Sequence, residues 1–163
     1  GNSSAESPNV VFLHSHNTGR YIEPYGYPAS TPALSRLARE GVLFYNAFSV
    51  APTCSPSRAA FLTGEYPHNC GMLGLGHRGF GLKDPEHHVA RVLQKAGYYT
   101  ALCGTEHIAK HGGSMDDAVG YDHVIPVQSP HGSDMAPAVA EFLRNPPEKP
   151  FFLSVGSRET HTP

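Results

Sequence analysis

Short apolar runs alternate along the chain with segments of helical character, and this alternation limits the possible folds more than any other feature. Runs typical of buried strands occupy residues 9–14, 42–48, 98–104, 123–127 and 151–155. Segments with helical spacing or helix caps lie between them, at residues 32–40, 55–63, 87–96 and 135–144. Such an alternation predicts an α/β fold in which helices cover both faces of a mostly parallel sheet.

The segments between these elements carry most of the polar side chains. Residues 65–85 are rich in glycine, histidine and proline without a period, which is typical of a long functional loop. Residues 105–121 form another irregular stretch, in which Asp116 and Asp117 are interpreted as solvated rather than as a paired-carboxylate site. His87 and His88 begin a helix, and we expect both side chains to be solvated.

Composition favours a single globular domain. The chain has 163 residues, of which 39% are hydrophobic and 16% charged, a balance that favours a folded core over disorder. The formal net charge of −2 gives no basic footprint for nucleic acid, and no apolar run is long enough to cross a membrane. Three cysteines are too few for a disulfide scaffold. Residues 1–7 are interpreted as a polar leader or a cloning remnant, and no signal peptide is visible.

The residues from 54 to 64 suggest an anion-handling helix start. Pro56 suits the first turn of a helix, and Gly64 suits its C-terminal end. Cys54 would then lie at the positive end of the helix dipole, among backbone N–H groups that lack helical partners. Arg58 lies one turn further along the same face and can reach back to an anion held at Cys54.

This stretch resembles the signature of the type I sulfatases, in the alkaline phosphatase superfamily. The likeness rests on Cys54, Pro56 and Arg58 at the family's offsets, followed by the Leu-Thr-Gly of residues 62–64. The resemblance implies that a formylglycine-generating enzyme oxidises Cys54 to formylglycine, whose hydrate attacks sulfur. It also implies an alkaline phosphatase-like fold, a divalent metal that is expected to be calcium, and a secreted, periplasmic or lysosomal location.

Within the family, the chain is most similar to the N-sulphoglucosamine sulphohydrolase branch, the heparan N-sulfatases. The supporting segments are residues 31–38, 43–48, 54–58, 69–75 and 150–153. This resemblance implies that residues 8–163 are the N-terminal portion of a catalytic domain acting on a sulfated sugar or glycosaminoglycan. By the same resemblance, His107 assists the formylglycine, and His161 binds the sulfate or protonates the leaving group. The sequence gives no indication of oligomeric state.

Three positions depart from the family pattern. Two adjacent aspartates that bind calcium in the family are His16 and Asn17 here, and a lysine expected near the sulfate is Thr105. Asn17 can offer calcium an oxygen, whereas the nitrogen of His16 suits a transition metal better, or His16 faces the substrate without binding metal. The family's second pair of metal ligands would lie beyond Pro163, so we expect the 163 residues alone to be inactive.

Two alternatives to sulfate hydrolysis remain at this point. A phosphonate or phosphate ester hydrolase of the same superfamily would share the Cys-x-Pro-x-Arg core. A non-catalytic member would bind a sulfated glycan without turning it over, and the altered pair His16 and Asn17 supports that alternative.

Overall fold

The computed structural model describes residues 7–109 and 120–161 of the chain. Within these residues four strands form one sheet: β1 (Val10–His14), β2 (Tyr99–Gly104), β3 (His123–Ile125) and β4 (Phe151–Gly156). Their order is β1-β4-β2-β3, and each neighbouring pair runs parallel. The parallel sheet predicted from the alternating sequence pattern is confirmed.

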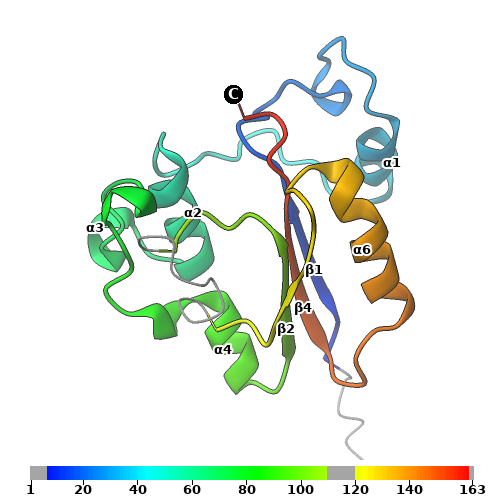
Figure 1. Cartoon of the computed structure of the whole chain (residues 1–163). Coiled ribbons are helices and arrows are strands. Elements are labelled where there is room, and N and C mark those ends of the chain that lie inside the picture. The colour runs from blue at the N-terminus through cyan, green and yellow to red at the C-terminus, as the bar shows by residue number, and fades with distance from the viewer. Residues whose placement is uncertain (1–6, 110–119, 162–163) are drawn as a thin grey trace, which may run out of the picture.

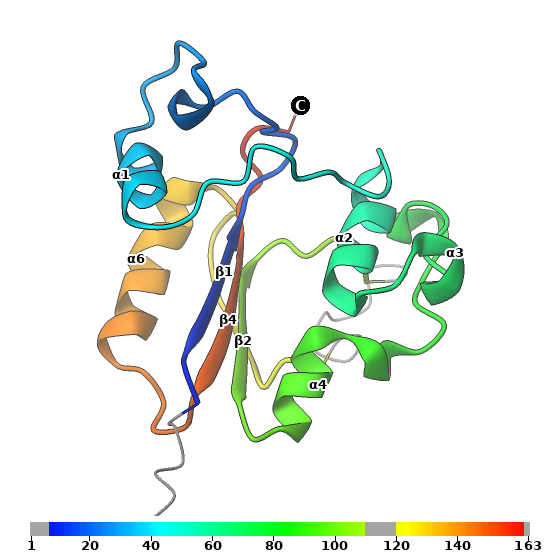
Figure 2. The ribbon, with the colours of Figure 1, turned by 180° about the vertical axis from the view of Figure 1, so that it is seen from behind.

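Helices cover both faces of the sheet. Figures 1 and 2 show α1 (Pro32–Glu40) and α6 (Gly132–Arg144) on one side, with α2 (Cys54–Thr63), α3 (Pro67–Cys70) and α4 (Val89–Lys95) on the other. Short 3-10 helices connect them: η1 (Glu23–Tyr25), η2 (Gly76–Arg78) and η3 (Pro85–His87). Among the described helices, none is both long and apolar enough to cross a membrane.

The central strand β4 supplies side chains to two cores, one on each face. Phe151, Leu153 and Val155 pack in the cluster that contains Met135 of α6. Phe152 points to the other face and belongs to the cluster that contains residues of α2 and α4. Every residue of β4 is buried, and burying one such large apolar side chain stabilises a fold by about 1.5–3 kcal/mol. β4 therefore fixes both helical layers to the sheet.

Two predictions about local structure were wrong. Residues 42–48 form no strand, and Val42 and Phe48 are 78% and 86% exposed. The run has a strand-like composition, but the described residues place no strand beside it, so its backbone has no ladder to join. His88 is fully buried rather than solvated. It is the residue between η3 and α4, and its Nδ1 caps α4 by accepting a hydrogen bond from Ala90 N.

Three strands end in one row at the carboxyl edge of the sheet. The register pairs Gly156 of β4 with His14 of β1 on one side and with Gly104 of β2 on the other. Gly104 has φ +85°, and a Cβ atom there would collide with the carbonyl oxygen of Gly156. A Cβ on Gly156 would collide with the carbonyl oxygen of Thr105. The loops that follow these strands therefore leave the sheet at nearly the same place.

We expect Gly104→Ala to destabilise the protein more than Gly97→Ala. Both glycines have positive φ, which costs a residue with a Cβ about 1–2 kcal/mol, but a Cβ at Gly97 meets no atom within 4 Å. At Gly104 the backbone of β4 must also move, giving a total loss of about 2–5 kcal/mol. Urea unfolding of the two variants measures the difference, and equal losses would contradict the close packing of the strand ends.

Candidate active site

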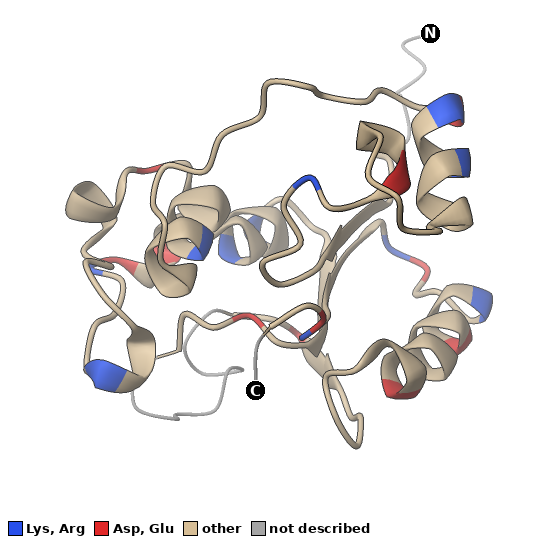
Figure 3. Ribbon diagram, turned by 90° about the horizontal axis from the view of Figure 1, so that it is seen from above, with Lys and Arg blue, Asp and Glu red and all other residues tan. Residues whose placement is uncertain are grey.

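A cavity of about 630 Å³ opens at the carboxyl edge of the sheet, the edge that Figure 3 views from above. Its lining includes Cys54 and Arg58 from α2 together with His16 and Asn17 from the loop after β1. His16 and Asn17 therefore share one cavity with Cys54. His107 and His161 join the same site through His16, as their ring contacts show.

Cys54 occupies the start of α2. Thr53 before it is extended, and its carbonyl accepts the first helical hydrogen bond, from Ser57 N at 3.0 Å. Gly64 ends the helix in the left-handed conformation, as the sequence predicted. The Cys54 thiol is free and half-buried, at the helix end where unpaired N–H groups favour an anion.

Arg58 is held beside Cys54 by the end of β1. Its NH1 lies 2.7 Å from Nδ1 of His14, and its NH2 donates to the Ser15 carbonyl at 3.4 Å. Burial, with a further contribution from the Arg58 charge, lowers the pKa of His14 to about 4. His14 is therefore neutral near pH 7 and accepts a hydrogen bond from the guanidinium. No role for His14 could be predicted from the sequence, because only the fold brings it to Arg58.

Three histidines from three different loops meet at the part of the cavity wall that His16 lines. The ring centroid of His16 lies 4.8 Å from those of His107 and His161, and both pairs are edge-on. His16 is 1% exposed, and its Nε2 is buried without a hydrogen-bond partner among the described residues. Burial, followed by electrostatic interaction with His16 and Arg58, lowers the pKa of His107 to about 4. His107 is therefore neutral near pH 7.

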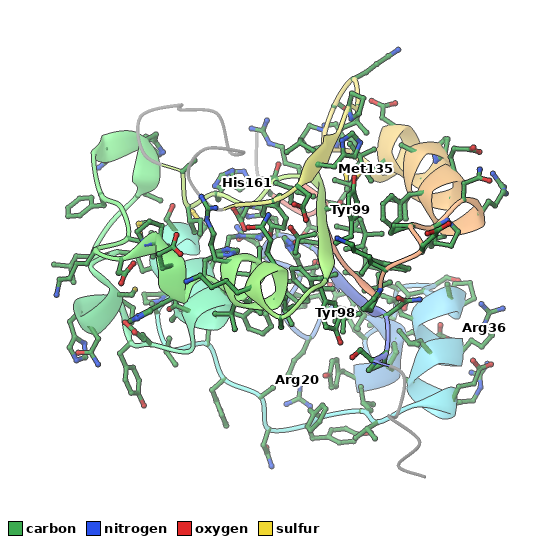
Figure 4. The ribbon with its side chains drawn as sticks, turned by 90° about the horizontal axis from the view of Figure 1, so that it is seen from below. Arg20, Arg36, Tyr98, Tyr99, Met135 and His161 are labelled. Carbon is green, nitrogen blue, oxygen red and sulfur yellow. The ribbon has the colours of Figure 1, made fainter. Side chains whose placement is uncertain are left out.

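The segment before His161 is fastened to the loop after β1 and to α6. His16 N donates to the Glu159 carbonyl at 2.6 Å, and Thr160 N donates back to the His16 carbonyl at 2.7 Å. The Glu159 carboxylate accepts from Ser157 Oγ and, at 3.1 Å, from Gly132 N at the start of α6. These hydrogen bonds, that of Ser157 foremost, lower the pKa of Glu159 to about 2. His161, which Figure 4 labels, is thereby held with its ring edge-on to that of His16.

A buried polar cluster lies directly before His107 in the chain. Glu106 and His88 are both fully buried, with His88 Nε2 2.8 Å from Glu106 Oε1. Tyr121 Oη donates to the same oxygen at 2.7 Å, and burial, then the Glu106 charge, raises the tyrosine's pKa. His107 follows with φ +69°, in the left-handed region. The irregular sequence of residues 105–121 gave no signal for this cluster, whose partners come from separate elements.

Comparison with known proteins identifies the family. The sulfatase family model matches residues 8–163 of the chain. The chain belongs to the sulfatase family. Mouse steryl-sulfatase is 48% identical over 86 residues, which cover 48% of this chain and 14% of the relative. Mouse arylsulfatase G is 31% identical over 155 residues, which cover 90% of this chain and 28% of the relative. The chain thus spans less than a third of either sulfatase.

Solved structures share the fold of this sulfatase chain. Ps i-CgsB, solved in complex with k-i-k-neocarrahexaose, has a TM-score of 0.79 at 21% identity, over 97% of this chain and 46% of its own. A protein solved with D-glucosamine-2-N,6-O-disulfate has a TM-score of 0.72 at 23% identity, over 96% of this chain and 35% of its own. The alkaline phosphatase-like α/β fold implied by the sequence resemblance agrees with both.

The described residues do not form the calcium site that the resemblance implied. They contain no group of three or more His, Cys, Asp or Glu side chains arranged to hold a metal ion. His16 brings nitrogen, and Asn17 Oδ1 lies 3.3 Å from His16 Nδ1. Calcium prefers several oxygen ligands, so His16, Asn17 and Cys54 do not fit it by themselves. Asp116 and Asp117 lie outside the described residues.

We expect Tyr121→Phe to destabilise the sulfatase more than Tyr98→Phe. Each substitution removes one hydroxyl that donates a hydrogen bond. Tyr121 donates to the buried Glu106 carboxylate, whereas Tyr98 donates to the exposed Pro8 carbonyl. Leaving a buried carboxylate short of a donor costs about 1–3 kcal/mol, and water replaces the donor at Pro8. Chemical unfolding at pH 7 tests this, and the prediction fails if the two losses are the same.

Proposed function

We propose that the protein hydrolyses a sulfate ester or sulfamate through a formylglycine derived from Cys54. The observation that carries the proposal is the meeting of Cys54, at a helix start, with Arg58 in one cavity. Membership of the sulfatase family supports it. For the substrate we propose the N-sulfoglucosamine of heparan sulfate-type glycans, supported by the sequence likeness to that branch and by the disulfated glucosamine in a structure of similar fold.

The formylglycine supplies chemistry that a cysteine lacks. Its hydrate carries two hydroxyls on one carbon, of which one attacks sulfur and the other, once deprotonated, expels sulfate as the aldehyde returns. A formylglycine-generating enzyme is the partner that this proposal requires. The position of Cys54 at the positive end of α2 suits an attacking oxygen and the sulfate oxygens that face it.

Arg58 is the fixed positive charge of the proposed reaction. Its guanidinium stabilises the attacking hydroxyl and the sulfate oxygens, whose charge grows as the sulfur–oxygen or sulfur–nitrogen bond breaks. His14 and the Ser15 carbonyl hold two of its nitrogens in place, which leaves other N–H donors for the anion. Burial makes this charge more effective than it would be in water.

His107 and His161 are the proposed proton carriers. His107 takes the proton from the second hydroxyl of the hydrate, and His161 binds the sulfate or gives a proton to the leaving amine or alcohol. An anion bound at Arg58 would offset that positive charge and raise the low pKa of His107, which makes it a better base when substrate is present.

A non-catalytic sulfated-glycan-binding protein is the second candidate, favoured by the neutral pair His16 and Asn17 in place of two carboxylates. A phosphonate or phosphate ester hydrolase would use the same Cys54 and Arg58. Competing assays with sulfate and phosphonate esters on the full-length protein separate the two enzymes, and absence of turnover on both favours the binding protein.

We expect Cys54 to be converted when the protein is made in a host that has the converting enzyme. Conversion replaces the thiol by an aldehyde, which lowers the mass of the peptide and makes it react with hydrazides. Cys54→Ser should abolish turnover and leave folding nearly unchanged, because a small polar residue suits a helix start. Mass spectrometry of the peptide that contains Cys54 tests the conversion. If protein from such a host carries only the unmodified thiol, the formylglycine proposal is wrong.

We expect His14→Leu to lower kcat by up to about 100-fold, because Arg58 loses the acceptor that orients its guanidinium. His14→Asn offers an amide oxygen near the position of Nδ1 and should recover part of the loss. Turnover of a sulfated glucosamine by the full-length variants measures both effects. An unchanged kcat in His14→Leu would contradict an orienting role for His14.

A further inference from the structure

A second cation, Arg20, lies on the loop between β1 and η1, and its neighbours Gly19 and Ile22 line the same cavity. The Arg20 Cζ lies 5.0 Å from the ring centroid of Tyr25. Tyr25 lines the cavity together with Cys54 and Arg58. Figure 4 shows Arg20 on this loop and Arg36 on α1, a different part of the surface. Arg20 therefore lies next to the cavity, over the ring of a residue that lines it.

The Tyr25 ring is a fixed platform for this guanidinium. Its hydroxyl donates to the Phe44 carbonyl at 2.8 Å, and its ring meets Tyr45 edge-on at 5.8 Å. Gly26 then ends η1 in the left-handed conformation. A cation over a held aromatic face is attracted to it, so the position of Arg20 is restricted before any ligand arrives.

The charge of Arg20 is not neutralised by its own loop. Glu23, the acidic side chain of that loop, accepts hydrogen bonds from Ser35 Oγ at 2.7 Å and from Thr31 N at 3.2 Å. Among the described residues, the structure records no hydrogen bond or ion pair for Arg20 itself. Its planar set of N–H donors, which matches sulfate and carboxylate oxygens, is therefore available to a ligand.

We propose that Arg20, stacked on Tyr25, binds a second anionic group of the substrate while Cys54 and Arg58 take the sulfate that is cleaved. This inference rests on the proposed function and narrows the substrate class to sugars with at least two negative charges. The second group is either another sulfate on the same sugar or the carboxylate of a neighbouring uronate. Both are oxyanions that a guanidinium binds through paired hydrogen bonds.

The test measures binding in the full-length protein carrying Cys54→Ser, so that no substrate is consumed. Calorimetry gives Kd for three ligands: N-sulfoglucosamine, its N,6-disulfate, and a disaccharide with a uronate beside N-sulfoglucosamine. Arg20→Gln should raise the Kd of a ligand with a second anion about tenfold more than the Kd of N-sulfoglucosamine. This is the effect expected from losing one hydrogen bond to a charged group. Arg20→Lys keeps the positive charge but lacks the planar guanidinium, so its Kd should lie between those of the wild type and Arg20→Gln. Arg36→Gln is the matched control, because Arg36 is exposed on α1 beside Glu40.

The two oxyanion sources give separate outcomes. If Arg20→Gln loses affinity for the disulfate relative to N-sulfoglucosamine, Arg20 binds a second sulfate. If it loses affinity for the disaccharide in the same comparison, Arg20 binds the uronate carboxylate. Equal changes for all three ligands, no change for any, no measurable binding of any, or the same loss in Arg36→Gln would overturn the inference. Failure of the proposed function is seen separately, as absent turnover by full-length protein that carries formylglycine.

Discussion

The parallel register of β1, β4 and β2 is the constraint on which the candidate site depends. It aligns His14, Gly156 and Gly104 in one row, and each of the three site histidines follows one of these strand ends within a few residues. Parallel strands deliver all their carboxyl ends to one edge, so residues distant in sequence meet there without a dedicated scaffold. The glycine pair keeps the row narrow, because a side chain on either would push the backbones apart. The edge-on contacts of His16 with His107 and His161 follow from that spacing.

The electrostatics of the site differ from those expected of a pair of carboxylates. His16 and Asn17 add no negative charge after β1, and burial keeps the pKa of His16 below its usual value. Arg58 is thus surrounded by neutral imidazoles, of which His14 fixes its orientation. An anion that enters the cavity meets a positive guanidinium and a helix start with little opposing charge at the cavity wall. Glu106 supplies a negative charge that also acts on Arg58, but it lies buried behind His107.

Local patterns predicted much of the fold, and they failed where a partner distant in the sequence decides the outcome. The helix end at Gly64 and the apolar runs of β1, β2 and β4 carry their structure in their own residues, and these predictions were confirmed. Residues 42–48 have the composition of a strand, but a strand needs a neighbour, which composition does not reveal. The same reason hid the contact between His14 and Arg58. Cys54 and Arg58 could be predicted because one turn of one helix brings them together.

The adjacency of Glu106 and His107 has a consequence for how such a chain can evolve. One residue is fixed by a buried cluster with His88 and Tyr121, and the next presents its ring to His16. A change that loosens the core at residue 106 therefore also moves the ring at residue 107. Selection for a stable fold and selection for a working site act on the same dipeptide, and neither property can drift there without the other.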